Sequence, residues 1–325
     1  FLYSHRRVRE TEIEGETRLV TEERAPLERP FQVLVPLAHP EHERALVEIG
    51  AAIARAHDGE LLLTTVVTVP KQTPLDAGRR FVGNERERLE AAMRHVPDDV
   101  PAHYTVTIGH DVGRSIANIS YQRDSELILV GWRGRRRRGT DRLLGDTLDR
   151  VVEEARCDVT VARLDGAERA DRILVPTAGG PHARLAGEVA GALLSRGGDA
   201  RLTLVTFGDD PVGRHRERLE EERERLAGEL DLEGGAARID VEVRPGTGDV
   251  AGDILAFAGA AGIDTIVIGA TREGRIRRAL LGAIPETVGE RFGGRVLMVR
   301  RHRPISGAIE AWLARWLGGR RRPGP

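Results

Sequence analysis

Two long segments of this chain carry the same order of short apolar runs, and this internal repeat limits the folds that the chain can adopt. VLVPL at residues 33–37 matches ILVPT at 173–177, and LILVG at 127–131 matches TIVIG at 265–269. In a chain of 325 residues, each segment has the size of one compact domain. We therefore predict a tandem duplication. The predicted parts are a linker at 1–30, copy one at 31–165, copy two at 170–302 and a tail at 303–325.

Within each copy, runs of Val, Ile and Leu alternate with longer helical patterns. This alternation favours an α/β fold in which crossover helices join the strands of an open, Rossmann-like parallel sheet. The strands expected in copy one are 31–37, 60–67, 103–108, 126–131 and 157–163, and its helices are 41–57, 84–95, 112–122 and 145–155. In copy two, strands are expected near 172–177, 200–206, 238–243, 264–269 and 295–300, with a charged second helix near 214–230. Asp111 and Asp249 are predicted to begin the third helix of each copy.

The composition excludes several functions. The chain has 50 Lys and Arg against 51 Asp and Glu, so no overall charge draws it to nucleic acid or to a membrane. No aromatic platform accompanies the arginines at 135–138, and we expect no nucleic-acid target. The single cysteine, Cys157, excludes an intrachain disulfide and is expected to be a buried, unreactive side chain. Neither a catalytic triad nor a complete set of metal ligands is visible, so we predict neither an enzyme nor a metal site.

The two ends of the chain have different patterns. The first residues, FLYSHRR, resemble the point where a membrane helix emerges on its cytoplasmic side, although no run here is long enough to cross a bilayer. We expect residues 1–30 to be an extended juxtamembrane linker within a larger protein. In the tail, Trp312 and Trp316 lie at helical spacing, with Arg315 and Arg320 beside them. This amphipathic segment is expected either to lie on anionic lipid or to dock on the protein itself.

Glycines follow the fourth predicted strand of each copy. Glycine lets backbone amides approach a ligand, and a helix start attracts anions, so these loops are candidates for a phosphate-binding site. The alternative is that they are only tight connections. The loop of copy one contributes Gly131, Gly134, Arg135, Gly145, Asp146 and Thr147. The loop of copy two contributes Gly269, Thr271, Arg272, Gly274, Gly282 and Ala283.

This arrangement resembles the universal stress protein family, and the resemblance extends over residues 31–302. The nucleotide-binding members of that family carry a Gly, two residues, a Gly, nine residues, and then a Gly followed by Ser or Thr. The resemblance implies that the ends of the first two strands of each copy complete the nucleotide site. The residues concerned are Leu37, Ala38 and Val66 in copy one, and Thr177 and Ala178 in copy two.

Both copies depart from the family pattern. The loop of copy one is one residue longer, and Asp146 stands where a hydroxyl would meet phosphate. Copy two has Arg272 for the second Gly and Ala283 for the hydroxyl residue. The family's Asp after the first strand, which meets the adenosine, is replaced by Ala38 and Ala178. These departures argue against the family's usual ATP mode, whereas the loop arginines favour another anion. The candidate ligands are ATP, AMP or a cyclic dinucleotide, and empty pockets are the alternative.

A second resemblance is to the tandem stress-protein tails of permeases of the amino acid, polyamine and organocation superfamily. It rests on GWRG at 131–134, LGDT at 144–147 and VPTAGGPH at 175–182. It implies a nucleotide-sensing, regulatory module at the cytoplasmic face of the cell membrane, joined in the same polypeptide to the membrane domain of an amino-acid transporter. A transporter of cationic amino acids is one candidate. The family also implies a pseudo-dimer within the chain, paired through the fifth strands, and allows a homo-oligomer. The alternatives are a free-standing, ATP-binding stress protein and a structural tail.

Overall fold

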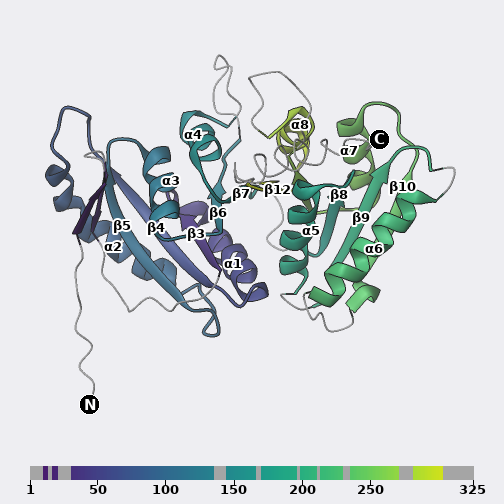
Figure 1. Cartoon of the computed structure of the whole chain (residues 1–325), viewed down its shortest axis with the longest axis horizontal. Coiled ribbons are helices and arrows are strands. Elements are labelled where there is room, and N and C mark those ends of the chain that lie inside the picture. Colours follow the sequence, from purple (N-terminus) through teal and green to yellow (C-terminus); the bar gives the residue numbers. More distant parts are fainter. Residues whose placement is uncertain are drawn as a thin grey trace, which may run out of the picture.

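The strands form one continuous sheet. The computed structural model describes residues 10–13, 17–20, 31–134, 144–165, 170–195, 198–210, 213–229, 235–270 and 281–302. Its sheet is 12-stranded, in the order β1-β2-β5-β4-β3-β6-β7-β12-β11-β8-β9-β10 (Figure 1). The strands are β1 (Glu10–Ile13), β2 (Thr17–Val20), β3 (Gln32–Pro36), β4 (Glu60–Thr68), β5 (Ala102–Gly109), β6 (Leu127–Gly131), β7 (Asp158–Arg163), β8 (Arg172–Pro176), β9 (Arg201–Phe207), β10 (Ile239–Arg244), β11 (Thr265–Gly269) and β12 (Arg295–Arg300).

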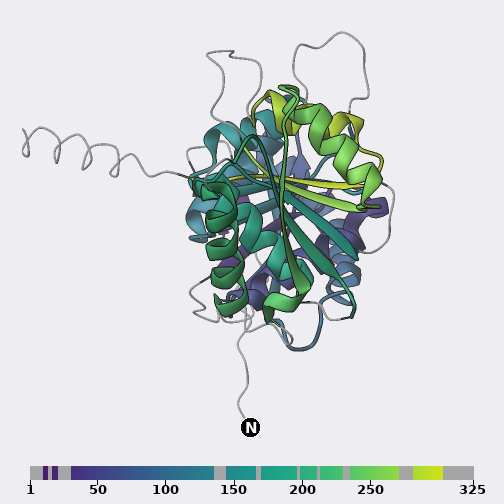
Figure 2. The ribbon, with the colours of Figure 1, turned by 90° about the vertical axis from the view of Figure 1, so that its right-hand side faces the viewer.

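Helices cover both faces of this sheet (Figure 2). One hydrophobic core lies under α1, α2, α5 and α6, and a second core lies under α3, α4, α7 and α8. Side chains of successive strand residues enter the two cores alternately: Leu127 and Leu129 enter the first, and Ile128 and Val130 the second. This double burial explains the continuous apolar runs of the sequence. The helices are α1 (Pro40–Ala56), α2 (Arg79–Met93), α3 (Val112–Gln122), α4 (Asp146–Glu154), α5 (Pro181–Leu194), α6 (Arg214–Glu229), α7 (Val250–Ala260) and α8 (Ala283–Arg291), with short 3₁₀ turns at Leu75–Gly78 and Gly235–Arg238.

The two copies join through their last strands. Within each copy β3 to β7, and β8 to β12, pair in parallel, as the sequence predicts. Between the copies, β7 pairs with β12 antiparallel, and Val161 lies opposite Met298. This is the edge-to-edge pairing expected of a pseudo-dimer. Because β7 and β12 run in opposite directions, the carboxyl end of each strand lies beside the amino end of the other. We call this join the seam.

An arginine at the end of each last strand reaches across the seam. Arg163 donates from Nη1 to the carbonyl oxygen of Gly289 (2.6 Å) and from Nη2 to that of Gly294 (3.0 Å), and it also bonds the carbonyl of Phe292. Arg300, at the matching position of β12, donates to the carbonyl of Val152 in α4. The last carbonyls of a helix have no partner within the helix. Each copy therefore caps the end of the other copy's last helix.

The N-terminal segment contains more structure than expected. Residues 10–13 and 17–20, predicted to be part of an extended linker, form an antiparallel hairpin, and β2 adds to the outer edge of β5 with Leu19 opposite Thr107. This pairing satisfies an edge that would otherwise be open. The hydrophobic start of the chain and the amphipathic tail at 303–325 lie outside the described residues. Among the described helices, none is long and apolar enough to cross a membrane.

Candidate nucleotide site

The glycine loop of copy one begins at the end of β6. The Gly131 backbone closes that strand, and the next residue, Trp132, is buried, with its amide donating to the carbonyl of Ala162 (2.7 Å). The Trp132 ring contacts the other copy: a Cβ built on Gly289 of α8 would lie 3.1 Å from it. The loop of copy one is thus anchored on the last helix of copy two. Arg135 lies outside the described residues.

The helix after each glycine loop begins in the same way. Gly145 precedes α4 with φ +90°, and Gly282 precedes α8 with φ +103°, a left-handed conformation that glycine adopts without strain. In α4, Asp146 lies in the first turn, where its carboxylate interacts favourably with the helix dipole. In α8, Glu286 accepts a hydrogen bond from the Leu281 amide (3.3 Å). Both helix starts therefore already hold carboxylates of the chain, as the sequence suggested for copy one.

Gly269 has a packing role. It ends β11, and a Cβ at this position would lie 2.6 Å from the carbonyl carbon of His182 in the first turn of α5. No other residue allows α5 to approach the strand so closely. Residues 271–280, which include Thr271, Arg272 and Gly274, lie outside the described part of the chain.

In copy one, an arginine lies at the end of the sheet where the adenosine was expected. Leu37 is buried at the end of β3, and Ala38 beside it is exposed. Arg88 of α2 donates to the carbonyl of Leu37 (2.6 Å) and forms ion pairs with Glu43 of α1 (2.9 Å) and Glu85 (3.0 Å). The Arg88 guanidinium therefore links α2 to α1 and to the end of β3, beside Leu37 and Ala38, which were predicted to contact the nucleotide.

In copy two, the corresponding place is an open cavity of about 530 Å³. It lies at the ends of β8 and β9, between the start of α5 and α6. Thr177 lines it where copy one has Leu37, and Thr206 lines it where the strand register of copy one has Thr65, one residue before Val66. Gly179 and Gly180 form its rim with φ of +86° and +94°, and the Gly179 amide donates to Thr177 Oγ1 (3.0 Å). Further lining residues with polar side chains are Arg184, His215, Arg218, Glu221, Glu222, Arg225 and Arg301.

The two copies differ at one position beside this arginine. Arg88 and Arg225 are equivalent, because each precedes a fully buried leucine on the second helix of its copy. Counting from the ends of β3 and β8, Ala183 stands in α5 where Glu43 stands in α1. Without that carboxylate, Arg225 pairs with Glu222 (2.5 Å) and other acidic groups on α5 and α6. The guanidinium stays along the helices and leaves the cavity open.

The structure thus assembles only part of the predicted set. Thr177 lines the cavity of copy two, whereas the Leu37 carbonyl accepts from Arg88 and the Val66 side chain packs against the core on the other face of the sheet. His215 and Arg218, whose side chains lie 2.7 Å apart, were not foreseen, because a charged helix gives no sign of which turn faces a cavity. No group of three His, Cys, Asp or Glu side chains that could hold a metal ion occurs in the described part of the chain.

The comparisons with known proteins identify the family. The model of the universal stress protein family matches residues 31–163 and again residues 169–300. The chain belongs to the universal stress protein family. A universal stress protein of Archaeoglobus fulgidus has the same fold, with a TM-score of 0.56, 18% identity, and coverage of 83% of this chain and 96% of the other. A putative universal stress protein of Pseudomonas aeruginosa gives a TM-score of 0.50 at 17% identity, covering 86% and 96%.

One curated relative is a membrane transporter. The Na(+)/H(+) antiporter NhaS5 of Synechocystis sp. is 32% identical over 154 residues. The match covers 46% of this chain and 22% of the antiporter, so the chain spans about a fifth of that relative's length.

Proposed function

We propose that this chain is the nucleotide-sensing, regulatory module of a membrane transporter, and that its ligand occupies the cavity of copy two. The observation that carries the proposal is the open 530 Å³ cavity at the sheet end, where the family resemblance expects a nucleotide. Its volume suits a small molecule. Arg184 and Arg218 supply guanidinium donors for an anion, and the glycine turn before α5 leaves the amides of a helix start nearby. The ligand would be ATP, AMP or a cyclic dinucleotide.

In this proposal copy one binds no nucleotide at the corresponding place, because Arg88 and Glu43 already satisfy each other there. The substitution Ala183→Glu supplies copy two with the carboxylate of copy one. It should draw Arg225 across the cavity and weaken binding. Glu43→Ala removes the partner of Arg88 and should open copy one.

The test is calorimetric titration of the chain with ATP, AMP and cyclic di-AMP, with and without magnesium. Saturable binding that Ala183→Glu weakens at least about tenfold is expected, which corresponds to the loss of roughly one charge-assisted contact. Ala256→Glu, on an exposed turn of α7, is the matched control and should bind as the unchanged chain does. Absence of binding by folded protein, or equal binding by Ala183→Glu, would contradict the assignment and favour a structural tail.

The link to a transporter is the second part of the proposal, and the antiporter relative supports it. We propose that the natural polypeptide continues into a membrane domain, as the amino-acid permease resemblance implies, with this module at the cytoplasmic face. An antibody raised against this chain should detect, in the membrane fraction of the source cells, a polypeptide well above 35.6 kDa. A band of 35.6 kDa in the soluble fraction would favour the free-standing stress protein.

A further inference from the structure

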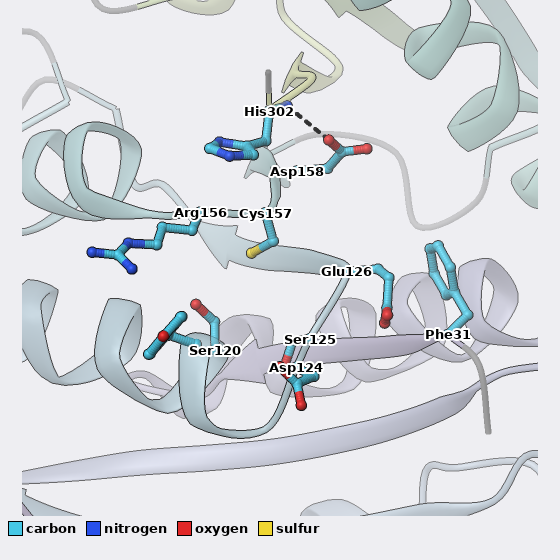
Figure 3. A pocket seen from close by; sticks show the side chains of 10 residues that line it. Phe31, Ser120, Asp124, Ser125, Glu126, Arg156, Cys157, Asp158 and His302 are labelled. Atoms are coloured by element: carbon cyan, nitrogen blue, oxygen red, sulfur yellow. Dashed lines mark hydrogen bonds between the residues drawn. The ribbon is translucent and has the colours of Figure 1, made fainter. Parts of the chain in front are cut away.

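A second cleft lies at the opposite end of the strands from the glycine loop of copy one. Its volume is about 520 Å³, and its walls come from the end of α3, the turn before β6, the residues before β7 and the segment after β12 (Figure 3). Phe31, just before β3, and His302, just after β12, both line it. The beginning of copy one and the end of copy two therefore meet in one cleft.

One wall of this cleft is acidic. Glu126 accepts a hydrogen bond from the amide of Gln32 (2.6 Å), and no Arg, Lys or His of the described residues forms an ion pair with it. Burial, together with the like charges of Asp124 and Glu60, raises the pKa of Glu126. A half-buried carboxylate in these surroundings would be stabilised by a cation that enters from outside. In Figure 3, the side chain of Glu126 lies on the same side of the cleft as Phe31.

The other wall carries the guanidinium group of Arg156. A neighbouring cavity of about 390 Å³ shares Arg156 and His302 with the cleft, and its further charged lining residues are Glu153, Glu154, Arg300 and Arg301, so this side holds charges of both signs. Burial and then the charges of Arg300 and Arg156 lower the pKa of His302, so the guanidinium groups carry the positive charge here. Arg156 lies 4.7 Å over the Tyr121 ring. A guanidinium that stacks on a ring keeps its in-plane N–H groups available as donors.

The two walls together define a ligand class. We propose that this cleft binds a small zwitterion of the α-amino-acid type, with its ammonium group beside Glu126 and its carboxylate beside Arg156. A metal ion would satisfy only the carboxylates of the cleft, and an inorganic anion only the Arg156 guanidinium. The volumes of the two neighbouring cavities each lie in the range of small-molecule sites. Arg300 and His302 come from copy two, so the bound ligand would contact both copies. The site is separate from the proposed nucleotide cavity and does not depend on it.

The test titrates the full chain with each of the twenty standard L-amino acids, first by thermal shift and then by calorimetry. For each amino acid that binds, the matching amine without the carboxylate and the matching acid without the ammonium group are titrated as well. Both analogues should bind at least about tenfold more weakly, because each loses one charge-assisted contact. Equal binding of the amine or of the acid would overturn the zwitterion assignment, and so would no binding of any amino acid by folded protein.

Variants locate the site. Glu126→Gln keeps an oxygen to accept from the Gln32 amide and removes the charge, and Arg156→Gln removes the other charge. Each should weaken amino-acid binding by about tenfold or more. Glu87→Gln, on an exposed turn of α2, is the matched control. Ala183→Glu, which blocks the nucleotide cavity, should leave amino-acid binding unchanged, and this separates failure here from failure of the proposed nucleotide site. Unchanged binding in both Glu126→Gln and Arg156→Gln would refute the proposal.

Discussion

Replacing Arg163 by methionine tests the cross-copy capping of helix ends. Methionine has a similar length but no donors, so the carbonyls of Gly289, Phe292 and Gly294 lose their partner on the buried guanidinium. At a net value of about 1–1.5 kcal/mol for each hydrogen bond, the free energy of unfolding should fall by about 3–5 kcal/mol. A loss of this size is a large fraction of the free energy of unfolding of a typical domain, which is roughly 5–15 kcal/mol.

Arg300→Met is the internal comparison for this prediction. Arg300 bonds one carbonyl, that of Val152, and burial lowers the pKa of its guanidinium, which means that the charge is costly to bury. Its removal should therefore cost only about 1 kcal/mol. Arg55→Met removes a more exposed ion pair with Asp99 and should change stability by less than about 1 kcal/mol. Urea unfolding followed by circular dichroism measures all three. Equal shifts for Arg163→Met and Arg300→Met would refute the capping argument.

Three further outcomes follow from single contacts. Gly289→Leu should destabilise the seam and change the Trp132 fluorescence, because the new side chain meets the indole ring. The Trp132 signal is obtained by subtracting the spectrum of the same protein carrying Trp132→Phe, and an unaltered Trp132 signal in Gly289→Leu would contradict this. Burial raises the pKa of Cys157 to about 12, so a thiol reagent should label it at neutral pH only after unfolding, and fast labelling of native protein would contradict this. The pKa of Glu126 is raised in the folded chain, so ionising this carboxyl group destabilises the fold. At a pH above that raised pKa, Glu126→Gln should therefore have a larger free energy of unfolding than the unchanged chain. Urea unfolding at a series of pH values should show this gain vanish as the pH falls to about 4.

Much of the fold could be predicted because it depends on periodicity. A strand buried on both faces has to be apolar throughout, and LILVG, which is the whole of strand β6 in copy one, shows this directly. Asp111 and Asp249 begin α3 and α7 as predicted, with side chains accepting from the amides of Arg114 (2.9 Å) and Gly252 (3.0 Å). The antiparallel strands at 10–13 and 17–20 were missed because they are short and polar, and because the strand that β2 pairs with, β5, is distant in sequence.

The candidate site was less predictable, because it depends on which way long side chains turn. The family pattern placed attention on the glycines, and Gly145 and Gly282 do begin α4 and α8. Nothing in the sequence shows that Arg88 bonds the carbonyl of Leu37 while Arg225 does not. Copy one has the carboxylate of Glu43 as a partner for Arg88, and only the packing of α1 against α2 brings it within reach.

The seam gives a physical reason why the two copies should respond together. Helix α8 begins at the glycine loop of copy two, ends at carbonyls that Arg163 of copy one holds, and contacts Trp132 of copy one along its side. A ligand that moves the start of α8 has two possible effects on the contacts of α8 with Arg163 and Trp132. If the contacts stay intact, the motion reaches the loop of copy one. Otherwise the contacts break. Breaking them costs the several kcal/mol estimated for Arg163. Transmission is therefore favoured whenever the ligand's preference between the two arrangements is smaller than that cost.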